Sequence, residues 1–341
     1  MTIPKQKTIQ TDRLKTAYYQ ASNPGKPKLL LVHGNASSAI FYVPLMERLK
    51  DDFDIIVPDL RGFGNTEALP IDATQGMKTW SEDLNSLADA LGWDKFTMMG
   101  WSLGGGVAEQ FAIDHPDRLD ALVLEAPCPP YGFGGTRDDD GTMLEPKNIG
   151  SGAGTTSKAL AKAMREGDRE MIRSMIRNVY CKPGFLLKLE WEEAMIDGVL
   201  LTRLGEDFYP GNTFTTDVWP YVIAGDKGIC NTMAPEYCNT SALAEIEPLV
   251  PILYFQGDDD IIISDHSLSD INVSGERQII PGWPGSEKAP AQPMVSQTRK
   301  VLGRYQQRGG KVREVHVPNS GHGCHLEQED LIVQEMKDFL L

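Results

Sequence analysis

The chain has 341 residues and a formal net charge of −15, with 41% hydrophobic and 24% charged residues. This balance is typical of a globular protein, long enough for one large α/β domain or for a domain with an inserted cap. The negative charge argues against nucleic acid and membranes as partners, since phosphate groups repel an acidic surface. No stretch approaches the roughly 18 apolar residues that span a bilayer, and residues 1–5 lack the apolar core of a secretion signal.

The cysteine pattern gives no sign of a metal or redox site. No two cysteines have the Cys-x-x-Cys spacing, and their number is odd. We therefore expect free thiols and a reducing cytoplasmic location. The five cysteines are Cys128, Cys181, Cys230, Cys238 and Cys324.

Apolar runs alternate with helical patterns in the first third of the chain. Such alternation predicts a doubly wound α/β fold, with a mostly parallel sheet and helices on both of its faces. We expect strands within residues 28–33, 53–58, 94–99 and 119–124, and helices within 41–49, 79–91 and 106–112.

The alternation stops near Pro127 and returns near residue 248. The intervening stretch opens with Gly/Asp-rich loops, continues with helical segments at 157–179 and 187–204, and ends in further loops. Beyond it we expect strands at 250–255 and 312–317 and helices at 294–308 and 326–340. The sequence thus predicts an α/β core made of residues 1–126 and 248–341, with a mainly helical cap inserted at 127–247.

The segment Gly100-Trp101-Ser102-Leu103-Gly104 has the pattern Gly-x-Ser-x-Gly between a predicted strand and a predicted helix. In that setting the serine occupies a sharp turn that exposes its hydroxyl. Glycine at both flanking positions suits a turn with no room for side chains. Glycine is also costly at a helix start, so a functional turn explains this run better than an ordinary helix does.

A serine hydroxyl is a weak nucleophile that needs a base, and the base needs a carboxylate to orient it. Both residue types follow later predicted strands, where the loops of a doubly wound sheet converge. Asp258, Asp259 and Asp260 follow one strand, and three adjacent carboxylates repel one another unless at least one has a partner. His322, which lies between two glycines, follows the next strand, and His325 lies close behind it.

Taken together, these motifs resemble the α/β-hydrolase superfamily over about residues 25–126 and 248–341. The insertion falls where that superfamily carries its cap. The matching segments are His33-Gly34-Asn35, Asp59-Leu60-Arg61-Gly62-Phe63-Gly64, the turn at Ser102, Gly257-x-x-Asp260 and Gly321-His322.

The resemblance implies roles for particular residues. Ser102 would be the nucleophile, His322 rather than His325 the base, and Asp260 the acid. Asp258, Asp259 and Glu125 are the alternative acids. The oxyanion hole would be formed by two backbone N–H groups, those of Asn35 and Leu103, and His33 would hold the loop that carries Asn35.

The resemblance further implies a carboxylesterase-like serine hydrolase that cleaves a small-molecule ester or related acyl bond through an acyl-enzyme. This implied serine mechanism would need no metal and no organic cofactor. A serine at position 102 disfavours dehalogenases and epoxide hydrolases of the superfamily, which use an aspartate. A carbon–carbon bond hydrolase, an acyltransferase and a proline iminopeptidase-like enzyme stay open, and an acidic cap would suit a cationic amine. The other class is a non-catalytic receptor on the same scaffold, which the complete Ser, Asp and His set disfavours.

The substrate and the oligomeric state cannot be read from this sequence. Aromatic residues of the predicted cap could line an acyl pocket or simply pack the cap. The segment 281–285, Pro-Gly-Trp-Pro-Gly, lies in an unusually long connection that could shape the entrance.

Overall fold

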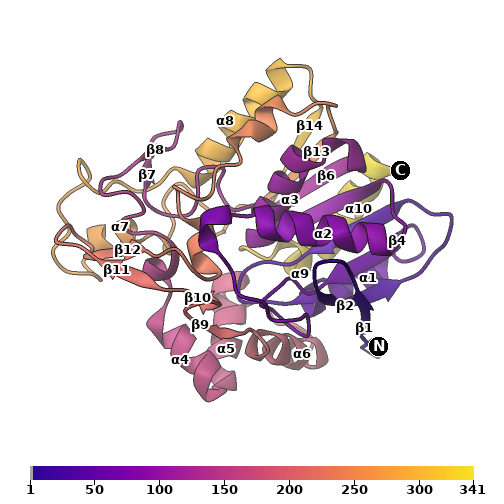
Figure 1. The fold of residues 1–341 in the computed structure, drawn as a ribbon, viewed down its shortest axis with the longest axis horizontal. Helices are drawn as coiled ribbons and strands as arrows, with labels where there is room; N and C mark the ends of the chain where they lie inside the picture. Colours follow the sequence, from indigo (N-terminus) through magenta and orange to yellow (C-terminus); the bar gives the residue numbers. More distant parts are fainter. Residues whose placement is uncertain (1–2) are drawn as a thin grey trace.

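One sheet of eight strands runs through the middle of the molecule in the computed structural model, which describes residues 3–341 (Figure 1). Strand β2 is antiparallel to both of its neighbours, whereas the six strands from β4 to β14 are mutually parallel. In spatial order the strands are β1 (Lys7–Gln10), β2 (Lys15–Ala21), β4 (Asp54–Pro58), β3 (Lys28–Val32), β5 (Phe96–Trp101), β6 (Leu119–Glu125), β13 (Ile252–Gly257) and β14 (Val312–Val317).

Helices cover both faces of this sheet (Figure 1). On one face α1 (Val43–Leu49) contacts α9 (Cys324–Glu327) and α10 (Glu329–Leu340); on the other, α2 (Lys78–Ala90) contacts α3 (Leu103–Asp114), and α8 (Met294–Gln307) packs against β14. The predicted doubly wound architecture is therefore confirmed. The chain passes from β3 outward to β4 and then back to β5 on the other side of β3. This reversal brings the loops after β3 and β5 together at the carboxyl edge of the sheet.

The N-terminal hairpin of β1 and β2 was not predicted. Most side chains of β1 are exposed, so this edge strand lacks the apolar run that marks a buried strand. Residues 1 and 2, which the predicted core also includes, lie outside the described residues.

The segment between β6 and β13 forms several small elements beside the sheet (Figure 1). Its helices are α4 (Lys158–Glu166), α5 (Arg169–Met175), a π-helical turn (Ile176–Tyr180) and α6 (Leu189–Leu200), and its short strand pairs are β7 (Thr136–Arg137) with β8 (Thr142–Met143), β9 (Leu204–Gly205) with β10 (Tyr209–Pro210), and β11 (Thr213–Thr215) with β12 (Val222–Ala224).

The prediction of a single helix at 157–179 is wrong in one respect, because the structure divides this segment into α4 and α5. Gly167 adopts a left-handed conformation with φ 71° and ends α4, a role that glycine fills without steric cost. Asp168 then accepts a hydrogen bond from the N–H of Met171 and caps the start of α5.

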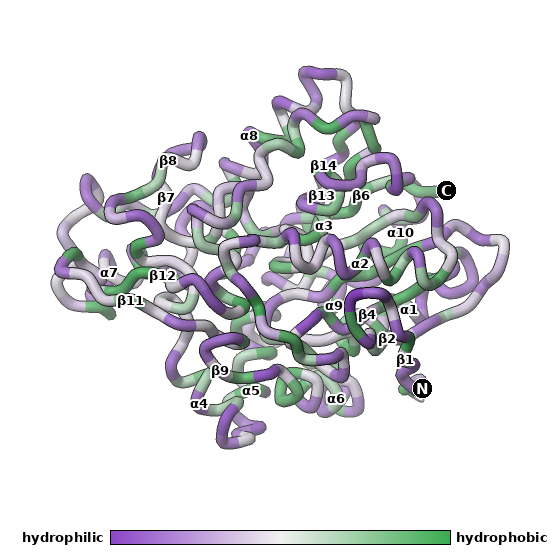
Figure 2. The backbone as a smooth tube through the Cα atoms, viewed as in Figure 1, coloured by the Kyte–Doolittle hydropathy of each residue, from purple (hydrophilic) through white to green (hydrophobic). Residues whose placement is uncertain are grey.

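The apolar core follows the sheet. Figure 2 shows hydrophobic stretches along the central strands and polar ones along the surface loops, and every residue of β5 and of β13 is buried. All five cysteines are buried and free of disulfides. Across residues 3–341, every helix is too short or too polar to cross a bilayer.

Candidate active site

Ser102 occupies the sharp turn between β5 and α3. Its backbone has φ 58° and ψ −121°, a strained conformation for a residue with a side chain. Two hydrogen bonds hold the turn: the N–H of Ser102 donates to the carbonyl of Glu125 (3.0 Å), and its carbonyl accepts from the N–H of Cys128 (2.8 Å). Glu125 is the last residue of the neighbouring strand β6 and Cys128 follows shortly after it, so the position of this turn is fixed by the adjacent strand.

The glycines around Ser102 are required by close approach of backbone to backbone. A side chain at Gly100 would overlap the carbonyl of Gly104, and one at Gly104 would overlap the carbonyls of Val32 and His33. The sequence predicted this reason for the glycines, and the structure gives the atoms that they accommodate.

Gly104→Ala is therefore expected to lower the free energy of unfolding by about 3 kcal/mol, because the added carbon overlaps backbone that cannot move aside. Gly303→Ala, within α8, is the matched control. A side chain at Gly303 meets nothing within 4 Å, so that change is expected to stabilise the protein by about 0.5–1 kcal/mol. Urea unfolding of both variants checks the pair; an equal effect of the two changes would contradict the close packing at Gly104.

His322 and Asp260 meet at the carboxyl edge of the sheet, on the loops after β14 and β13. Nδ1 of His322 lies 2.9 Å from Oδ2 of Asp260, and both side chains are buried. The other carboxylate oxygen of Asp260 accepts backbone N–H bonds from Ile262 (2.7 Å) and Ile263 (3.0 Å). These bonds fix the carboxylate, so it can orient the imidazole and leave Nε2 available.

The other two adjacent carboxylates point elsewhere. Asp258 is half exposed and lies 3.3 Å from Nδ1 of His316, and Asp259 forms an ion pair with Lys182 (2.8 Å). Of these three aspartates, only Asp260 is buried, and it is the one that forms a hydrogen bond with His322.

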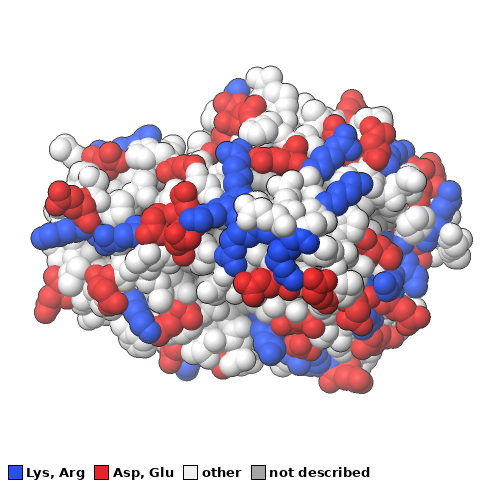
Figure 3. Space-filling view, turned by 90° about the horizontal axis from the view of Figure 1, so that it is seen from above, with Lys and Arg blue, Asp and Glu red and all other residues white. Residues whose placement is uncertain are grey.

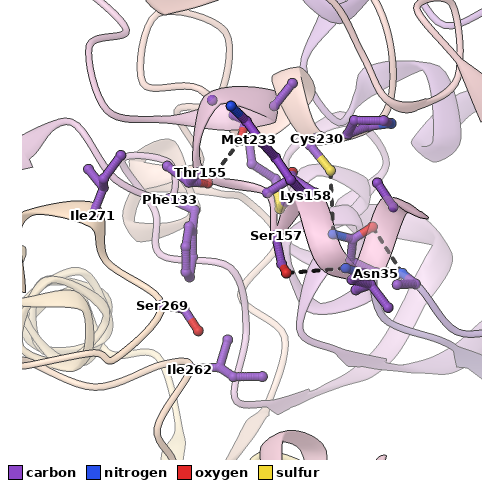
Figure 4. A pocket seen from close by; sticks show the side chains of 18 of the residues that line it. Asn35, Phe133, Thr155, Ser157, Lys158, Cys230, Met233, Ile262, Ser269 and Ile271 are labelled. Carbon is purple, nitrogen blue, oxygen red and sulfur yellow. Dashed lines mark hydrogen bonds between the residues drawn. The ribbon is translucent and has the colours of Figure 1, made fainter. Parts of the chain in front are cut away.

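The loop after β3 lies against Ser102. A side chain at Gly34 would come within 3.1 Å of Cβ of Ser102, so the adjoining Asn35 lies beside the turn. The amide side chain of Asn35 is held by the N–H of Ala36, which donates to Oδ1 (3.0 Å), and by Sγ of Cys230, which Nδ2 approaches to 3.6 Å (Figure 4). Leu103 is the first residue of α3, and the first N–H of a helix has no partner within it.

His33 ties two of these loops together. Its Nε2 accepts a hydrogen bond from the N–H of Leu60 (3.0 Å), and its Nδ1 lies 2.8 Å from the carbonyl of Gly34. The ring is therefore neutral, with its proton on Nδ1. Burial lowers the pKa of His33 from 6.5 to about 4, because a second proton on Nε2 would also face the N–H of Leu60.

This pKa shift predicts a loss of stability in acid. Between about pH 6.5 and pH 4 the unfolded chain takes up a proton that the folded His33 refuses, so the free energy of unfolding falls by about 3 kcal/mol over that range. Burial raises the pKa of Asp59, which has the opposite effect. Urea unfolding of the wild type and of His33→Gln from pH 7.5 to 4 separates the two, because Asp59 is common to both. We expect the difference in the free energy of unfolding between the wild type and His33→Gln to become smaller as the pH falls. A difference that stays constant would contradict the lowered pKa of His33.

A second buried acid–histidine pair, which the sequence did not reveal, lies behind the first. Nδ1 of His325 is 2.8 Å from Oε1 of Glu125, and the backbone N–H of His325 donates to the same oxygen (2.9 Å). The ring of Trp101 packs against both histidines, with its centroid 5.3 Å from that of His322 and 5.1 Å from that of His325. Its indole N–H donates to the carbonyl of His322 (2.8 Å).

Among the residues that the sequence singles out, Glu125 is an alternative acid and His325 the alternative base. In the structure these two residues pair with each other, and His322 pairs with Asp260. The signal was present in the sequence, since a carboxylate at the end of a buried strand needs a partner, but no pattern indicated which one.

Comparison with known proteins identifies the fold to which this geometry belongs. Residues 27–146 match a family model described as the alpha/beta hydrolase fold. Almost the whole chain also superposes on a solved structure, a thermophilic esterase from Thermogutta terrifontis, with a TM-score of 0.58, 20% identity, and coverage of 99% of this chain and 98% of that one. The chain has the α/β-hydrolase fold.

Two curated proteins are similar to about a third of the chain. A hydrolase of Saccharomyces cerevisiae without assigned function is 33% identical over 114 residues, which is 33% of this chain and 39% of that protein. A pimeloyl-[acyl-carrier protein] methyl ester esterase of Pectobacterium carotovorum is 32% identical over 117 residues, 34% of this chain and 43% of that protein. The matches thus span about two fifths of these relatives.

Ser102, His322 and Asn35 line one cavity of about 1140 Å³. Its remaining wall comes from the segment after β6, including Phe133 and Tyr180, and from the connection between β13 and β14. That connection contains α7 (Ile271–Glu276) and contributes Ile262, Ser269 and Ile271, which Figure 4 labels, as well as Ile280. None of the residues 281–285, the predicted entrance loop, is among the lining residues. Two separate stretches of chain therefore enclose the cavity: the predicted insertion and, in addition, the connection between β13 and β14.

Proposed function

We propose that this chain is a serine hydrolase that cleaves an ester, or a related acyl bond, through an acyl-enzyme. The observation that carries the proposal is the 2.9 Å contact between His322 and Asp260 at a cavity that Ser102 also lines. The esterase activities named for the Pectobacterium relative and for the Thermogutta structure support the same class of reaction.

In the proposed first step, the hydroxyl oxygen of Ser102 attacks the acyl carbon while Nε2 of His322 takes its proton. Asp260 accepts the hydrogen bond from Nδ1–H of His322 and stabilises the imidazolium that forms. The N–H groups of Asn35 and Leu103 are the proposed donors to the oxyanion. His322 then returns the proton to the departing alcohol.

In the second step, water replaces the alcohol. His322 removes a proton from that water, the resulting hydroxide attacks the acyl carbon, and the bond to Ser102 breaks as its oxygen regains the proton. We further propose that residues 127–247 act as a cap over this site. Tyr180 supports that role, since its hydroxyl donates to the carbonyl of Asn35 (2.8 Å) and so joins the insertion to the proposed oxyanion loop.

The cavity wall disfavours an aminopeptidase. Among the lining residues within 3–341 there is no aspartate or glutamate, so nothing there would pair with the ammonium group of an amino-acid substrate. On the face of the molecule that Figure 3 shows, acidic side chains are interspersed with lysine and arginine.

A fluorophosphonate probe tests the proposal and separates an enzyme from a receptor on the same scaffold. We expect one covalent adduct, mapped to Ser102 by mass spectrometry of the digested protein. Ser102→Ala should abolish the adduct, whereas Ser269→Ala, a serine of the same cavity wall, should retain it. A wild-type protein that forms no adduct, or forms it at another residue, would overturn the proposed nucleophile.

A further inference from the structure

The wall of the cavity contains one charged side chain among the described residues, and it is a cation. Lys158 lines the cavity at the start of α4, together with the hydroxyl-bearing residues Thr155 and Ser157. The chain has 48 acidic residues against 33 lysines and arginines, so a wall with one lysine and no carboxylate differs strongly from the rest of the molecule.

Lys158 has no partner within the described residues. No hydrogen bond or ion pair joins its ammonium group to another residue of 3–341, whereas Lys162, one turn further along the same helix, pairs with Glu166. The neighbouring Ser157 uses its oxygen to accept a bond from the N–H of Leu160 (3.2 Å), and this leaves its hydroxyl proton available as a donor. Figure 4 shows Lys158 and Ser157 on one side of the cavity, with Ile262 and Ile271 on the other.

We infer that the substrate carries a carboxylate at the far end of its acyl chain and that Lys158 is the residue that recognises it. This inference rests on the proposed function. Lys158 is exposed although it lines the cavity, so its ammonium group stays hydrated and can attract a carboxylate by charge without the cost of burying either group. Lys158 is also the one cation that the described wall provides. A charge on the acyl part stays in the cavity through both steps, so the same contact holds the ester and the acyl-enzyme.

The inference makes Lys158 a specificity residue with a measurable preference. The test compares two sets of esters with matched chain length: mono-p-nitrophenyl esters of straight-chain dicarboxylic acids, and p-nitrophenyl esters of the corresponding monocarboxylic acids. We expect the wild type to prefer the carboxylate-bearing set at one or more lengths. Lys158→Met should lower kcat/KM for that set about threefold to fivefold, mainly through KM, and leave the neutral set unchanged.

Two further variants sharpen the test. Lys158→Glu should reverse the preference and favour an ester with a terminal ammonium group. Lys162→Met removes a lysine from the same helix but not from the cavity wall, and it should leave both sets unchanged. Equal losses on both sets in Lys158→Met, or a wild type that prefers neutral esters at every length, would overturn the inference. The proposed function fails separately, if no ester is cleaved and the phosphonate forms no adduct.

Discussion

Ser102→Ala is expected to lower kcat for ester hydrolysis by about 10⁴-fold or more, because the acyl-enzyme cannot form without its oxygen. What remains would come from binding and from the proposed oxyanion donors. Stopped-flow or steady-state assays with a p-nitrophenyl ester measure the loss. The change removes a single oxygen from a partly exposed side chain, so circular dichroism and the urea midpoint should stay near those of the wild type.

Ser269→Ala supplies the comparison for that experiment, since Ser269 lines the same cavity but lies on a different loop. We expect its kcat to remain within about threefold of the wild-type value. If Ser102→Ala hydrolysed the ester as fast as the wild type, Ser102 could not be the nucleophile.

Asp260→Asn is expected to lower kcat by about 10⁴-fold. The amide has nearly the same shape and can still accept the N–H bonds of Ile262 and Ile263 through its oxygen. Its NH₂ group would then face Nδ1 of His322, which would have to carry its proton on Nε2 and could no longer act as a base. The effect should therefore fall on kcat, with KM little changed.

Asp258→Asn is the matched control, because it makes the same chemical change two residues away. Asp258 is half exposed and contacts His316 rather than His322, so its kcat should stay within about twofold of the wild-type value. Comparable losses in the two variants would mean that the orientation of His322 does not depend on the Asp260 carboxylate.

The sequence predicts the parallel strands well because most of them are short apolar runs bounded by turn residues, and in β14 valines are interspersed with polar residues. It predicts the hairpin of β1 and β2 poorly, since an edge strand with polar side chains has no such run. The division between α4 and α5 depends on the conformation of Gly167 and on the cap that Asp168 provides. The helical pattern continues across both residues, so the sequence alone reads them as part of one helix.

The candidate site shows the same limit. Asp258, Asp259 and Asp260 are adjacent and chemically identical, so composition cannot choose among them. The choice depends on how the loop after β13 leaves the sheet and turns one carboxylate inward. The pairing of Glu125 with His325 is a contact across 200 positions. A single sequence, taken without its relatives, does not indicate which distant residues meet.

The neighbouring positions of β6 and β13 in the sheet have a consequence for synthesis on the ribosome. Strand β13 pairs directly with β6, yet it follows β6 only after the whole intervening segment has been translated. At roughly 5–20 residues per second, the edge of β6 waits on the order of 10 s for its partner. A nascent chain therefore displays an unpaired apolar strand during that interval, which makes it a candidate for chaperone binding.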